Sequence, residues 1–92
     1  GCFAIVLECV PETLAAEISA ALIIPTIGIG AGAQTDGQVL VMQDLLGLSS
    51  DFKPKFVRRY LDGRRLWQEA FNAYASDVKS GQFPAAEESY GQ

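Results

Sequence analysis

Hydrophobic residues gather in three short runs in the first half of the chain, and these runs predict three strands. The first, residues 3–8, begins with five consecutive apolar side chains, which is typical of a strand buried on both faces of a parallel sheet. Residues 25–30 and 38–42 form the other two runs. Residues 38–46 also fit the period of a helix, so the third strand has a helical alternative.

Apolar residues at helical spacing predict a helix between the first two strands. Leu14, Ile18 and Leu22 recur at every fourth position, which indicates an amphipathic helix with one apolar stripe. Pro11 suits the first turn of that helix, because its missing N–H is not needed there. The helix is expected to end before Pro25, since the residue before a proline resists helical geometry.

The second half of the chain is predicted to be helical. One helix is expected to begin at Pro54, and a longer one to run from about Arg64 to Ser80, with Gly81 following its last turn. The longer helix carries an aromatic and apolar stripe at helical spacing, namely Trp67, Phe71, Tyr74 and Val78. We interpret the stripe as a packing surface, either on the body of the protein or on another subunit.

This order divides the chain into three parts. Residues 1–50 are expected to form βα units, residues 51–81 helices, and residues 82–92 a loosely held polar tail. Strand, helix, strand, loop and strand is the order of an α/β fold with a parallel sheet. Because the chain enters an apolar run directly after Gly1, we expect it to be the C-terminal part of a longer protein.

Composition excludes several classes of function. A formal charge of −4 argues against a nucleic-acid partner, whose binding is driven by clustered cations. No histidine is present, so His-dependent triads and His-ligated zinc are excluded within these residues. Cys2 and Cys9 match no zinc or redox spacing and indicate reduced, buried thiols of a cytoplasmic protein. Residues 18–35 are uncharged, but proline and glycines interrupt them, so no membrane span is expected.

Glu8 is the first candidate for chemistry, because it ends the first apolar run. Active sites of parallel α/β folds form at the carboxyl ends of strands. Burial at that place would disfavour the charged carboxylate and raise its pKa toward neutrality, which suits a general base. The alternative is a structural carboxylate near the start of the following helix. The catalytic hypothesis requires Glu8 to lie on the same rim as the glycine turn and away from bulk water.

Glycines after the second run are the next candidates. Residues 28–33 fit a loose dinucleotide fingerprint, but residues 31–37 are too few for the helical crossover that this fingerprint requires. We therefore expect Gly30 and Gly32 to let the backbone turn, or approach a neighbour or a substrate closely. Asp44 would end the third strand on the same side, where it could contact substrate or cap the short segment after it.

Two pairs of arginines flank the expected break between the helices, namely Arg58, Arg59, Arg64 and Arg65. Clustered arginines can bind phosphate or nucleic acid. In a chain of net negative charge, two such pairs more often form a solvated face, and we interpret them in that way.

Five motifs in one order resemble the C-terminal part of the ketopantoate hydroxymethyltransferase (3-methyl-2-oxobutanoate hydroxymethyltransferase) family. The motifs are VLECVP at 6–11, IPTIGIGAG at 24–32, DGQVLV at 36–41, PKFVRRY at 54–60 and GQFP at 81–84. The resemblance spans essentially the whole chain. It implies the C-terminal portion of a (β/α)₈ TIM barrel, about strands 6–8 with the terminal helices.

The same resemblance implies a reaction. Members of the family move a hydroxymethyl group from methylenetetrahydrofolate to α-ketoisovalerate and so form ketopantoate, a step of pantothenate biosynthesis. Mg²⁺ bound to the keto acid stabilises the enolate, and the glutamate that matches Glu8 removes the proton from the β-carbon. The family assembles as homo-oligomers, typically decamers, to which the C-terminal helices contribute contacts.

The rest of the family's site has no counterpart in these residues. The acidic metal ligands and the substrate-contacting lysine lie on earlier strands, so we expect no metal ligand in this chain and no activity from it alone. Three positions depart from many relatives, namely Cys2, Gln43 and Glu88. Two alternatives stay open: a non-catalytic oligomerisation module and a nucleotide-binding α/β domain.

Overall fold

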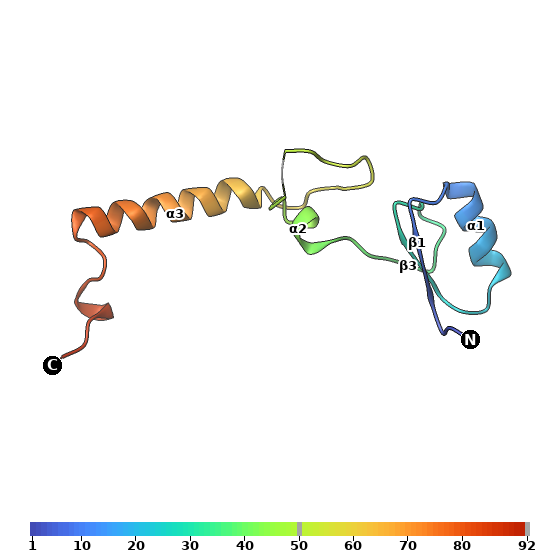
Figure 1. The fold of residues 1–92 in the computed structure, drawn as a ribbon, viewed down its shortest axis with the longest axis horizontal. Coiled ribbons are helices and arrows are strands. Elements are labelled where there is room, and N and C mark those ends of the chain that lie inside the picture. The colour runs from blue at the N-terminus through green and yellow to red at the C-terminus, as the bar shows by residue number, and fades with distance from the viewer. Residues whose placement is uncertain (50, 92) are drawn as a thin grey trace.

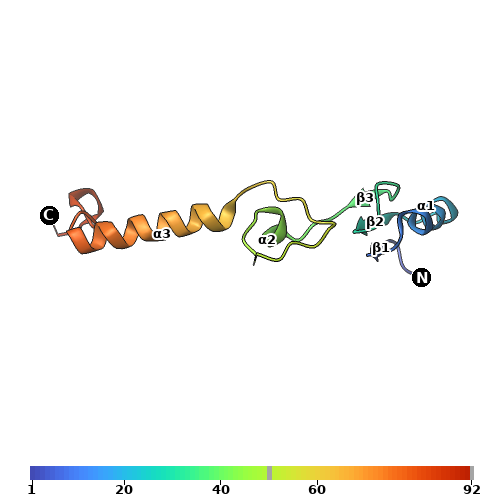
Figure 2. The same ribbon diagram turned by 90° about the horizontal axis from the view of Figure 1, so that it is seen from above.

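The computed structural model describes residues 1–49 and 51–91. A small unit of sheet and helix lies at one end of the molecule, and a long helix extends from the other (Figures 1 and 2). The extents along the principal axes are 67 × 31 × 16 Å. The elements in chain order are β1 (Ile5–Glu8), α1 (Glu12–Ala21), β2 (Thr26–Ile29), β3 (Gly37–Gln38), α2 (Met42–Leu45), α3 (Gly63–Ser80) and a 3₁₀ turn, η1 (Ala86–Glu88).

The sheet has three parallel strands in the order β1-β2-β3, which confirms the prediction of an α/β fold with a parallel sheet. Ile5 to Glu8 pair with Thr26 to Ile29 in register. The helix α1 connects the first two strands, so β1, α1 and β2 form one βαβ unit. Residues 50 and 92, which bound two of the expected parts, lie outside the described residues.

Only one face of β1 is covered. Leu7 is buried against Ala15 of α1 and Ala31, and Ile5 packs on the same cluster. Successive side chains of a strand point to opposite faces, so Val6 and Glu8 share the other face, where both are exposed. The prediction that the strand is buried on both faces is therefore wrong for the described residues.

The third predicted strand is also wrong in its extent. Only Gly37 and Gln38 pair with β2, and residues 42–45 form α2 instead, so the helical alternative is partly correct. The third strand is short because β2, the strand it pairs with, ends at Ile29. Gly30 then adopts a left-handed conformation with φ of +69°, which turns the chain away. The Val39 amide still donates to the Gly28 carbonyl at 3.0 Å, but once β2 turns away, no described strand remains for residues 40–42 to pair with.

The helix predicted to begin at Pro54 is absent from the structure. The segment forms a single turn, in which the Val57 amide donates to the Pro54 carbonyl at 3.0 Å. Further along, amides bond to a distant part of the chain: that of Tyr60 donates to Leu45 at 2.7 Å and that of Gly63 to Leu46 at 2.9 Å. These tertiary hydrogen bonds replace those that would have continued a helix.

The long helix is confirmed. It begins at Gly63 and ends at Ser80, where Gly81 adopts φ of +81° in the position expected of a helix-ending glycine. The tail is held more closely than predicted. The Phe83 ring packs edge-on against Tyr74 of α3, with centroids 5.3 Å apart, and Gln82 N donates to the Asp77 carbonyl.

The described residues bury little surface. They expose 7264 Å², whereas a compact monomer of 9.9 kDa exposes about 5,200 Å². The radius of gyration is 21.7 Å, against about 12 Å for a compact chain of this length. None of the described helices is both long and apolar enough to cross a membrane. Cys2 and Cys9 are free, as expected, but both are exposed, so their predicted burial is wrong.

Candidate functional site

The glutamate and the glycine turn lie on the same rim of the sheet. Glu8 is the last residue of β1 and pairs in parallel with Ile29, the last residue of β2. The Cys9 amide donates to the Ile29 carbonyl at 2.9 Å, which extends the pairing past the end of the strand. Gly30 follows directly, so one of the two conditions for the catalytic hypothesis is met.

The other condition is not met by the described residues. Glu8 is exposed, because it lies on the face of β1 that carries no covering helix. Within residues 1–49 and 51–91, no hydrogen bond or ion pair holds its carboxylate. The structural alternative finds no direct support either, since Pro11 occupies the capping position before α1 and no side chain caps that helix. Glu8 is thus a carboxylate at the rim, available to a ligand.

The two candidate glycines are required by close neighbours. Gly30 and Gly32 have φ of +69° and +81°, values that side chains other than glycine rarely adopt. A methyl group at Gly30 would lie 3.1 Å from the Phe56 ring, and one at Gly32 would lie 2.5 Å from the Glu12 Cγ atom. The turn therefore packs against α1 on one side and against the segment around Phe56 on the other.

A hydrogen-bond network fixes the return of the chain to the sheet. Thr26 is fully buried at the start of β2, and its amide and hydroxyl donate to the Asp36 carboxylate at 2.8 and 3.1 Å. The Asp36 amide donates to the Thr26 hydroxyl oxygen at 3.1 Å, and Ser19 of α1 lies 2.7 Å from the same oxygen. The loop leads from β2 into β3 and not into a helix, so the dinucleotide fingerprint is not formed.

Asp44 is not at the end of a strand. It lies within α2, half-buried, and accepts a hydrogen bond from the Ser49 hydroxyl at 2.8 Å. The prediction of its place was wrong because it depended on the extent of the third strand. Its carboxylate is used locally and does not line the groove described next.

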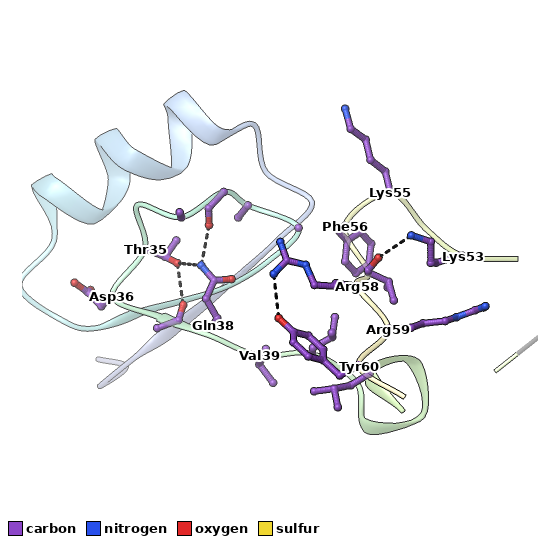
Figure 3. A pocket seen from close by; sticks show the side chains of 18 residues that line it. Thr35, Asp36, Gln38, Val39, Lys53, Lys55, Phe56, Arg58, Arg59 and Tyr60 are labelled. Atoms are coloured by element: carbon purple, nitrogen blue, oxygen red, sulfur yellow. Dashed lines mark hydrogen bonds between the residues drawn. The ribbon is translucent and has the colours of Figure 1, made fainter. Parts of the chain in front are cut away.

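A groove of about 1410 Å³ opens between the glycine turn and a segment more than twenty residues further along the chain (Figure 3). One wall consists of residues 30–33 and 35–40, and the other of residue 45 and residues 53 and 55–60. Its polar side chains are Thr35, Asp36, Gln38, Lys53, Lys55, Arg58, Arg59 and Tyr60. The sequence pattern did not predict this groove, because the two arginine pairs at 58–59 and 64–65 are interpreted together as a solvated face. The absence of acidic residues from 53 to 60 was the available signal.

Acidic and cysteine side chains do not converge on a metal-binding arrangement in the part of the chain that the structure describes. We therefore assign no metal ligand to these residues. Gly30 lines the groove, as does Gly32, whereas Glu8 lies at the rim outside it.

Comparisons with a family model and with curated proteins point to the same family. The family model for ketopantoate hydroxymethyltransferase matches residues 1–86. Proteins named 3-methyl-2-oxobutanoate hydroxymethyltransferase are similar over 90 residues: one from Francisella tularensis is 54% identical and one from Salinibacter ruber 61%, each match covering 98% of this chain and 34% of the relative. One from Chlorobaculum tepidum is 58% identical, with 98% and 32% covered.

The chain thus spans about a third of the length of the curated relatives that it matches. The match to the family model begins at the first residue, includes β1 with Glu8, the glycine turn and α3, and ends in the tail. These 92 residues belong to the ketopantoate hydroxymethyltransferase family of enzymes.

Proposed function

We propose that the protein containing this chain transfers a hydroxymethyl group from methylenetetrahydrofolate to α-ketoisovalerate and forms ketopantoate. The observation that carries this proposal is the family match over residues 1–86. We further propose that the parallel sheet is part of a (β/α)₈ barrel, near its last three strands. The place of Glu8 at the carboxyl end of β1 supports that architecture, since barrel enzymes build their sites there.

Glu8 is proposed as the general base. The hydrogen on the β-carbon of α-ketoisovalerate is acidified by the neighbouring ketone, and its removal leaves an enolate. The proton passes to the Glu8 carboxylate, and the enolate carbon forms a bond to the one-carbon unit. The two bonds from that carbon to the folate nitrogens break, and water supplies the hydroxyl oxygen. The two protons of the water and the proton held by Glu8 are shared between the two nitrogens of the departing tetrahydrofolate and the new hydroxyl group, so the reaction balances. An exposed rim carboxylate with no described partner is free to accept that proton once substrate lies over it.

Magnesium does not fit the described residues, since no set of acidic side chains converges there. No step is therefore derived through the ion, and its ligands are proposed to belong to parts of the longer protein. Burial of Glu8 is proposed to come from the same parts, which would cover the open face that it shares with Val6. A cytoplasmic location, indicated by the free thiols of Cys2 and Cys9, belongs to the same proposal.

A chimaera tests the proposed reaction. In it, this chain replaces the matching segment of the Francisella tularensis relative. We expect the chimaera to form ketopantoate from α-ketoisovalerate and methylenetetrahydrofolate at a rate within about 100-fold of the unaltered relative, because a misplacement of about 1 Å costs about that factor. Product is measured by chromatography. The relative with the matching segment deleted is the negative control. A folded chimaera that performs no better than this deletion would contradict the proposal.

An oligomerisation role is favoured by one observation on α3. Its stripe of large apolar side chains is exposed, and the helix projects away from the sheet (Figures 1 and 2). The exposed fractions are 55% for Trp67, 65% for Phe71 and 56% for Tyr74. A stripe of this kind marks an interaction surface when it is contiguous. We propose that α3 contributes to contacts between copies in a homo-oligomer, which accompanies catalysis and does not replace it.

The size of the chimaera tests this second role. We expect light scattering to give a mass several times that of one copy, and Phe71→Glu to lower it, because a buried charge at the contact costs more than the contact gains. Ser76→Glu, which places the same charge at an exposed position on the opposite side of the helix, is the control. An unaltered mass in Phe71→Glu would exclude this face from the contact.

A further inference from the structure

The cations of this acidic chain are concentrated in one short segment. Residues 53–59 hold four of the seven lysines and arginines and no aspartate or glutamate. The structure folds this segment against the glycine turn, so the cationic side chains line a groove (Figure 3). The net charge of the chain is −4, but it is an average over all residues and does not report a local concentration of positive charge such as this groove.

The two arginines outside the groove, Arg64 and Arg65, form ion pairs with acidic side chains. Arg64 pairs with Asp51 at 3.2 Å, and Arg65 pairs with Asp62 at 2.7 Å and Glu69 at 2.9 Å. Hydrogen bonds to Asp62 and Glu69 raise the pKa of the Arg65 guanidinium. These charges are already balanced by acidic neighbours.

Three cations of the groove, Lys53, Lys55 and Arg58, are not paired with an acidic side chain among the described residues. Among residues 1–49 and 51–91, no carboxylate lies within ion-pair distance of Lys53, Lys55 or Arg58. Lys53 donates to the Val57 carbonyl at 3.3 Å, and Arg58 donates to the Tyr60 hydroxyl at 3.2 Å. Both acceptors are neutral, so the positive charges remain available to a ligand.

The cationic wall is held in place by its own contacts. The Arg58 guanidinium lies 5.9 Å from the centre of the Tyr60 ring, a cation–π arrangement, and the Tyr60 amide donates to the Leu45 carbonyl at 2.7 Å. Val57 lies between Lys55 and Arg58 in the sequence, and its side chain is buried. A side chain that is already oriented loses less freedom when it binds a ligand.

The opposite wall is ordered as well. The Gln38 side-chain amide donates to the Gly32 carbonyl at 2.8 Å and to the Thr35 hydroxyl at 3.1 Å. Figure 3 shows Arg58 pointing toward Gln38 across the groove. Asp36 also lines the groove, but its carboxylate accepts two hydrogen bonds from Thr26, and it lies at the end remote from Lys53 and Lys55.

We propose that this groove binds a small anionic ligand that carries two or more carboxylate or phosphate groups. Arginine offers a planar pair of donors that matches either group, and the two lysines supply further positive charge along the same wall. The volume of about 1410 Å³ accommodates a small molecule, since pockets for such ligands have about 300–1,000 Å³. The inference concerns binding and does not depend on the proposed reaction.

Two double variants of the chimaera test this site. Lys55→Gln with Arg58→Gln removes two groove charges, and Arg64→Gln with Arg65→Gln removes two charges outside it. The net charge is therefore the same in both. Binding of pyrophosphate and of a tri-glutamate peptide is measured by calorimetry at an ionic strength of about 0.15 M, where loosely attracted anions are screened. We expect the groove variant to bind at least about tenfold more weakly than the control variant.

The two probes distinguish the chemistry of the ligand. Selective binding of pyrophosphate would identify phosphate groups, and selective binding of the peptide would identify carboxylates. Equal weakening in both variants, or no saturable binding of either probe, would overturn the proposal. Thermal unfolding of each variant checks the fold, and if the double variant unfolds, Lys55→Gln alone changes one exposed side chain and should still weaken binding several-fold.

Discussion

In the chimaera, Glu8→Gln is expected to lower the rate of ketopantoate formation by about 10²–10⁴-fold. Glutamine keeps the size and polarity of the side chain but has no carboxylate to accept the proton. The Michaelis constant for the keto acid should change little, because the loss concerns the transition state of proton transfer and not substrate binding. Initial rates at several substrate concentrations separate the two effects.

A second readout follows the proton itself. Without the one-carbon donor, the unaltered chimaera should exchange the β-hydrogen of α-ketoisovalerate with deuterium from the solvent, and Glu8→Gln should not. Glu17→Gln is the matched control, because Glu17 is an exposed carboxylate on α1 and has no proposed role. Exchange that continues at the same rate in Glu8→Gln would show that another group removes the proton.

Gly63→Ala is expected to destabilise the chimaera by about 1–3 kcal/mol, a cost typical of overpacking. On an exposed helix the same change stabilises by about 1 kcal/mol, so the sign of the effect tests the structure. A methyl group at Gly63 would overlap the Leu46 carbonyl oxygen and lie 2.6 Å from a methyl carbon of Leu48. Hydrogen bonds from Gly63 to Leu46 and from Arg64 to Gly47 hold the start of α3 there.

Gly37→Ala is the control for this change. A methyl group at Gly37 would meet only Ile27, at 3.9 Å, which is an ordinary contact. Thermal unfolding of both variants, monitored by circular dichroism, should give a lowered midpoint for Gly63→Ala and an unchanged or slightly raised one for Gly37→Ala. A raised midpoint for Gly63→Ala would mean that α2 and α3 do not approach as closely as the structure indicates.

The amino-acid pattern was sufficient for the elements whose conformation depends on near neighbours. The apolar run before Glu8, the spacing of Leu14 and Ile18, and the glycine after Ser80 each correspond to an element or an end of one in the structure. A parallel arrangement of the first two strands was enough to place Glu8 and Gly30 on one rim, since parallel strands end together. The family also follows from motifs that lie in this order along the chain.

Contacts between distant segments decided the rest. The proline at 54 begins a turn and not a helix because the amides of Tyr60 and Gly63 bond to the carbonyls at the end of α2, those of Leu45 and Leu46. The groove exists only because the glycine turn packs against Phe56, which brings cations beside a loop that precedes them by about twenty residues. Periodicity reports which face of an element is apolar, but hydrogen bonds and close approaches across the fold determine which segments meet, and no local pattern carries that information.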